Sequence, residues 1–159
     1  MSTVERVRIV TAPETGKVLS ALIGKPVQVK ELPPAKTLDD LHVVATYVHE
    51  DGTLAAAFAL DLTVAAGLAA ALTLVPPGVA ADSIRARKLE PMLEENLHEV
   101  FNIAARFFSS AKSPRIVLKW TGVPGDAALK QFWATAPTRS TVELTFAPYK
   151  GGRIAMVAH

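Results

Sequence analysis

Residues 41–61 have the sequence LHVVATYVHEDGTLAAAFALD, in which two apolar runs flank a short polar stretch. The first run, residues 41–48, is rich in β-branched and aromatic side chains, and the second, residues 54–60, is apolar throughout. Between them, Glu50, Asp51 and Gly52 are residue types that favour a tight turn. This stretch therefore predicts a β-hairpin, which is the clearest local feature of the sequence.

Two helices are expected after the hairpin. Asp61 is a typical N-cap for an alanine-rich helix over residues 64–74, which the Pro-Pro-Gly of residues 76–78 should end. A longer helical region is expected from its cap Asp82, with Pro91 marking either a kink or a new first turn. Apolar residues recur there at three- and four-residue spacings, which predicts one face packed on a sheet. They are Leu89, Met92, Leu93, Leu97, Val100, Phe101, Ala104, Phe107 and Phe108.

Further elements are expected on both sides of this centre. Toward the N-terminus they are a strand over residues 4–9, a helix from its cap Thr11 to Gly24, and a short edge strand over residues 27–30. Toward the C-terminus they are a strand over residues 115–120 and a hairpin whose strands, residues 141–146 and 153–157, are joined around Lys150-Gly151-Gly152. Residues 126–133 fit either a short helix or an irregular arm. The fold class is α/β of the α+β type: a mainly antiparallel sheet with two or three helices packed on it, in a single domain over residues 1–159.

Composition excludes several classes of function. The chain has 159 residues, a formal charge of +2 and no cysteine, so a disulfide framework, a thiolate metal site and a cysteine nucleophile are excluded. The first residues lack the layout of a signal peptide, and Asp61 interrupts the most apolar stretch, so we expect a cytoplasmic protein that does not enter the membrane. The basic run of residues 85–88 has no interleaved aromatic residue, so no nucleic-acid partner is expected.

The helix over residues 89–108 has polar residues opposite its apolar stripe. Glu95, Glu99, Asn102 and Arg106, spaced four, three and four apart, share one face, and His98 lies at its margin. Pattern alone favours an ordinary solvated face with weak ion pairs. Glu95 and His98 also have the spacing of di-iron carboxylate bundles, but no second copy exists, so no metal site is expected.

The order of elements around this helix resembles the CheC/CheX family of chemotaxis phosphatases. The resemblance rests on residues 51–72 and on Glu95-Asn96-Leu97-His98-Glu99-Val100-Phe101-Asn102-Ile103, which is similar to that family's helix motif ending in Glu-x-x-Asn-Ile. It covers about two-thirds of the chain, and residues 1–40 are the more divergent part. It implies a single-site, CheX-like domain.

The resemblance implies a role for each polar residue of the helix. Glu99 and Asn102 would be the catalytic pair that acts on a phosphorylated response regulator: Glu99 would bind the regulator's lysine, and Asn102 would orient the attacking water. Mg²⁺ and the phospho-aspartate would belong to the regulator, so no cofactor of the chain's own is expected. Glu95, His98 and Arg106 would contact the partner. The family has a glycine-containing turn after the asparagine, where this chain has Arg106, Phe107 and Phe108.

Two alternatives stay open at this point. The same fold could be a catalytically silent signalling module that binds its partner through the Glu95–Arg106 helix face, or an alanine-rich oligomer without a site. The strand over residues 142–146 could be an exposed edge that pairs in a homodimer, as the resemblance also implies. Trp120 and Trp133 are expected to serve packing rather than to line a ligand cleft.

Overall fold

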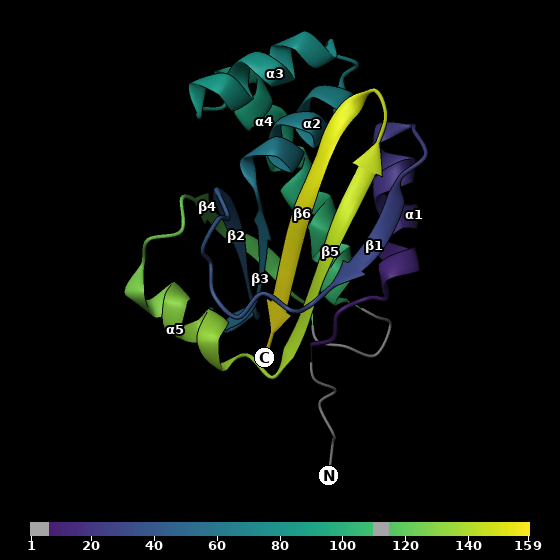
Figure 1. Ribbon diagram of the computed structural model, residues 1–159. Helices are drawn as coiled ribbons and strands as arrows, with labels where there is room; N and C mark the ends of the chain where they lie inside the picture. Colours follow the sequence, from purple (N-terminus) through teal and green to yellow (C-terminus); the bar gives the residue numbers. More distant parts are fainter. Residues whose placement is uncertain (1–6, 110–114) are drawn as a thin grey trace.

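The computed structural model describes residues 7–109 and 115–159. Within these ranges six strands form one antiparallel sheet in the order β1-β5-β6-β3-β2-β4 (Figure 1). The strands are β1 (Gln28–Leu32), β2 (Val43–Val48), β3 (Leu54–Leu60), β4 (Val117–Gly122), β5 (Thr138–Phe146) and β6 (Tyr149–Ala158). The helices are α1 (Ala12–Ile23), α2 (Leu62–Leu72), α3 (Pro77–Ala86), α4 (Pro91–Ala104), the 3-10 helix η1 (Ala105–Phe108) and α5 (Ala127–Thr135). The predicted α+β class is confirmed.

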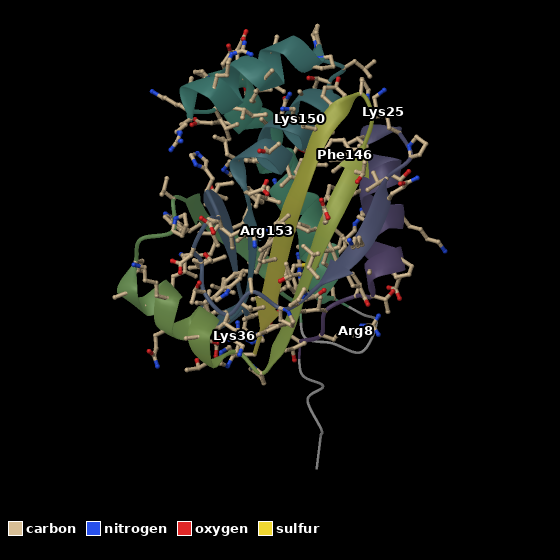
Figure 2. All side chains as sticks on the ribbon, in the orientation of Figure 1. Arg8, Lys25, Lys36, Phe146, Lys150 and Arg153 are labelled. Atoms are coloured by element: carbon tan, nitrogen blue, oxygen red, sulfur yellow. The ribbon has the colours of Figure 1, made fainter. Side chains whose placement is uncertain are left out.

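The sheet is covered on both faces, by different numbers of helices. Helices α1, α2 and α4 cover one face over the main apolar core, which includes Phe58, Phe146 and Met156. Helix α5 covers the other face, where Trp133 packs with Ala59 and Val157 in a second, smaller cluster. Helix α3 lies against α2 beyond one end of the sheet (Figure 1). Basic side chains labelled in Figure 2 lie at separate places on this framework rather than in one patch.

The central hairpin forms as predicted. Strands β2 and β3 pair antiparallel from Val43 opposite Leu60, and Gly52 has the positive φ of 87° that the turn requires. The carboxylate of Asp51 accepts hydrogen bonds from the Thr53 amide at 2.9 Å and hydroxyl at 2.6 Å, which lower the pKa of Asp51. The turn residues therefore hold the register that places both strands in the centre of the fold.

The predicted caps of the first two helices are also confirmed. Thr11 accepts a hydrogen bond from the Glu14 amide, and α1 ends before Gly24, whose φ is 68°. Asp61 caps α2 by accepting from the Val64 amide at 2.8 Å, and its second oxygen accepts from the Arg153 amide at 2.8 Å. One carboxylate therefore fixes the start of α2 against strand β6.

The boundaries between α2, α3 and α4 differ from the prediction. Pro77 begins α3 instead of only ending α2, and Asp82 lies inside α3 rather than capping the next helix. The physical reason is that a proline ends one helix but also suits the first turn of another, where its missing N–H is not needed. Pro91 acts in the same way and opens α4, so the predicted helix start at Leu89 is wrong and the new first turn is correct.

The C-terminal hairpin is longer than predicted and turns elsewhere. Strands β5 and β6 are joined at Ala147 and Pro148, whereas Gly151 and Gly152 lie inside β6. A Cβ on Gly151 would be 1.7 Å from the Leu144 carbonyl oxygen, so this glycine is required by close approach and not by a turn. Strand β5 also pairs with both β1 and β6, so the predicted exposed edge at residues 142–146 is wrong.

Three smaller predictions have different outcomes. Residues 7–10 form no strand, because the Val10 amide donates to the Phe107 carbonyl and not to a neighbouring strand, and residues 4–6 lie outside the described ranges. Of the two alternatives for residues 126–133, the helix is correct: α5 follows its N-cap Asp126. Trp133 is buried as predicted, whereas Trp120 is 44% exposed on β4.

Candidate functional site

Helix α4 is anchored through its apolar face. Proline at its first position pre-sets the helical backbone, and five side chains at three- and four-residue spacings are buried. They are Leu93, Leu97, Val100, Phe101 and Ala104. Met92, which was assigned to the same stripe, is instead 45% exposed, because it lies on the solvent side of the first turn.

Aromatic contacts hold the end of the helix on the sheet. The Phe58 ring of β3 lies 5.9 Å from the Phe101 ring, edge to face, and 5.7 Å from the Phe107 ring. Tyr47 and Phe108 pack with their ring centres 5.4 Å apart. Phe107 and Phe108 are therefore core residues, and both are fully buried.

Hydrogen bonds fix α4 at two further points. Asn96 donates through Nδ2 to the Ala69 carbonyl and to the Thr73 hydroxyl, both at 2.9 Å, which joins α4 to the end of α2. The Tyr47 hydroxyl donates to the Phe101 carbonyl at 2.6 Å. Burial raises the pKa of Tyr47, so its hydroxyl keeps the proton that it donates. Hydrogen bonds thus fix α4 to both α2 and β2, in addition to the apolar contacts that its buried face makes with the core.

Tyr47→Phe is expected to lower the free energy of unfolding by roughly 1–2 kcal/mol, because a buried carbonyl near the helix end loses its donor while the ring remains. Urea unfolding monitored by circular dichroism would measure the change. Thr135→Val on α5, which removes an exposed hydroxyl bonded to its own helix, is the control and should change stability much less. Equal losses in the two variants would contradict the assigned role of the Tyr47 hydroxyl.

The predicted site residues do not all point the same way. Glu95, Glu99 and Asn102 are exposed on the outward face of α4. His98 lies on the flank toward β4, where it lines a cavity, whereas Arg106 borders a hollow beside Lys17 of α1. Glu95, Glu99 and Asn102 therefore stay on one face with His98 at its margin, as predicted, whereas Arg106, predicted on the same face, lies on η1 and borders α1. In the described part of the chain, no three histidine or carboxylate residues gather as a metal site.

The cavity beside His98 was not predicted. It has a volume of about 470 Å³ and lies between the start of β2, the linker after α3, helix α4 and the end of β4. Arg87, Lys88 and Thr121 are among its lining residues, together with His42. These residues are far apart in the sequence. No local sequence pattern could have predicted that they line one cavity. The order of strands in the sheet, with β4 next to β2, brings them together.

Comparison with known proteins shows likeness in structure but not in sequence. No family model matches the chain, and no curated protein matches it. The FliM middle domain of Vibrio alginolyticus superposes with a TM-score of 0.60 at 9% identity, over 92% of this chain and 88% of that one. FliY of Thermotoga maritima gives a TM-score of 0.55 at 13% identity, over 90% and 81%. The chain has the FliM/FliY middle-domain fold.

The predicted antiparallel α+β architecture is therefore confirmed as the fold of the FliM/FliY middle domains, whereas a specifically CheX-like domain is not shown. A FliG–FliM complex from H. pylori gives a TM-score of 0.56 at 10% identity, over 92% of this chain and 85% of that one. Identities this low establish the fold alone. No helix within residues 7–109 and 115–159 is both long enough and apolar enough to cross a membrane.

Proposed function

We propose that the chain docks on a phosphorylated response regulator through α4 and accelerates hydrolysis of its aspartyl phosphate. The observation that supports this most is the position of Glu99 and Asn102, which are exposed, adjacent on one face and presented by a helix anchored on its opposite face. A rigid helix can place side chains accurately in a partner's cleft. The likeness to the FliM and FliY middle domains is consistent with such a partner-binding setting.

The two residue types suit this reaction. A carboxamide both donates and accepts hydrogen bonds, so Asn102 would hold a water in line with phosphorus without titrating. Glu99 would dock on a lysine of the regulator, where the paired charge makes its desolvation tolerable. The regulator would supply the phospho-aspartate and Mg²⁺. Glu95 lies on the same outward face and would contact the rim of the partner, with His98 and Arg106 contacting it on either flank.

A second candidate is a silent binding module of the same fold. The position of Arg106 favours it, because this cation follows Asn102 by one turn and borders the α1 side of the face, where the related family has a smaller residue. One of the structural neighbours is a FliG–FliM complex, so the fold is used elsewhere in a protein assembly. Both candidates use α4, but only the first requires chemistry at Asn102.

Dephosphorylation assays separate the two candidates. Response regulators of the source organism are phosphorylated with acetyl phosphate, and loss of phosphate is followed with and without the protein. We expect faster loss with at least one regulator, and at least a roughly tenfold drop in that acceleration with Asn102→Ala. The matched control Gln131→Ala removes an exposed carboxamide from α5 and should act as wild type.

Binding measurements complete the test. Binding of the regulator should survive Asn102→Ala and be lost in Glu99→Lys, whereas Glu14→Lys on α1 should have no effect. If no regulator loses phosphate faster but Glu99→Lys still abolishes binding, the silent module is correct and the phosphatase proposal fails. If neither change affects rate or binding, α4 has no partner of this kind.

A further inference from the structure

The cavity between α4 and β4 is partly open to solvent and has room for a small molecule. Its volume of about 470 Å³ falls in the range of roughly 300–1,000 Å³ that small-molecule sites occupy. The linker after α3, helix α4, the start of β2 and the end of β4 all contribute lining residues. Four segments of the chain meet there, so its shape depends on the folded domain as a whole.

The floor of the pocket is apolar. Leu89, Leu97 and Phe101 line it, and each is at most 5% exposed. Phe101 is held from behind by its edge-to-face contact with Phe58, so the floor is supported by the main core. An aromatic or heteroaromatic ring laid on this floor would gain chiefly by removing its own apolar face from water.

The charged rim favours an anion. Arg87 and Lys88 of the linker and Glu94 of α4 line the cavity, so these three fixed charges leave an excess of one positive charge. Thr121 of β4 and the imidazole of His98 add groups that hydrogen-bond an acidic oxygen. Guanidinium and ammonium groups form strong, charge-assisted hydrogen bonds with sulfonate, carboxylate or phosphate oxygens.

The linker that presents the two cations is held by its backbone. Arg87 adopts a positive φ of 54° as the C-cap of α3, where its amide donates to the Ile84 carbonyl at 3.2 Å. The Lys88 amide donates to the Ser83 carbonyl at 3.2 Å, and the Ser83 hydroxyl accepts from the Glu90 amide at 3.3 Å. Little backbone entropy would then be lost when a ligand binds, because the linker is already ordered.

We propose that this pocket binds a small aromatic anion, with the ring on the apolar floor and the acidic group between Arg87 and Lys88. The site is separate from the outward face of α4 and does not depend on the proposed phosphatase activity. His98 borders both, so an occupant of the pocket would change the flank of the surface that is proposed to meet the partner.

The probe for this site is naphthalene-2-sulfonate, titrated into the ¹⁵N-labelled protein and followed by NMR. We expect saturable shifts at the amides of His98, Thr121 and Gly122. Affinity should drop at least roughly tenfold in the double variant Arg87→Gln/Lys88→Gln, which removes both charge-assisted contacts. The double control Arg85→Gln/Lys119→Gln removes equal charge outside the pocket, from α3 and β4, and should bind as wild type.

Three further measurements separate the parts of the proposal. Inorganic sulfate lacks the ring, and naphthalene-2-methanol lacks the charge, so each should bind at least roughly tenfold more weakly than the sulfonate. Thr121→Tyr, which fills the mouth of the pocket from the exposed strand, should abolish binding of the sulfonate while circular dichroism stays unchanged. Three outcomes would overturn the proposal. The first is equal affinity for the neutral alcohol and the sulfonate, and the second is chemical-shift changes scattered over the whole protein. The third is an unchanged affinity for the sulfonate in Arg87→Gln/Lys88→Gln.

Discussion

Replacing Gly151 by alanine is expected to lower the free energy of unfolding by roughly 3–5 kcal/mol, which is at the severe end for a single methyl group. The new Cβ would lie 1.7 Å from the carbonyl oxygen and 2.8 Å from the carbonyl carbon of Leu144. Both are backbone atoms of the neighbouring strand β5, so no side-chain rotation relieves the clash. Strands β5 and β6 would have to separate next to the turn that joins them, where their register shifts between Leu144 and Phe146.

Gly78→Ala is the matched control for this prediction. Gly78 lies in the first turn of α3, where an added Cβ meets nothing within 4 Å, so alanine should leave stability unchanged or raise it slightly. Thermal unfolding measures both variants, since each kcal/mol shifts the midpoint of a domain of this size by roughly 2–4 °C. A Gly151→Ala protein as stable as Gly78→Ala would mean that β6 does not approach β5 as the structure shows.

Phe58→Ala is the second change with a large expected effect, a loss of roughly 3–5 kcal/mol. The Phe58 ring is fully buried and contacts both Phe101 of α4 and Phe107 of η1. Its removal leaves a cavity between the sheet and the helix that presents Glu99 and Asn102. The same variant should therefore increase amide hydrogen exchange in α4 more than in α5, which packs on the other face of the sheet.

Trp120→Ala tests whether these effects come from burial rather than from aromatic character. Trp120 is 44% exposed on the edge strand β4, so its removal should cost about 1 kcal/mol or less. Urea denaturation measures the free energy of unfolding of the Phe58→Ala and Trp120→Ala variants under the same conditions. If the Phe58 and Trp120 variants lose similar stability, or if exchange in α4 does not change, Phe58 does not anchor the helix.

Local chemistry made much of the fold predictable. Asp51 and Gly52 set the central hairpin, Asp61 capped α2, and the spacing of apolar residues placed one face of α4 on the sheet. The errors occurred where one residue type serves two purposes. Pro77 was assigned to end a helix and instead begins one, and Gly151 was assigned to a turn and instead accommodates a close backbone approach.

The amphipathic pattern of α4 is a property of the sequence by itself, because helical periodicity alone puts Glu95, Glu99 and Asn102 on the face opposite the apolar stripe. Only the tertiary structure decided that His98 belongs to a cavity and that Arg106 borders α1. The same holds for strand β5, which lies inside the sheet rather than at its edge. These outcomes depend on which distant segments become neighbours, and pairing between strands is set by the packing of the whole sheet and not by any one segment.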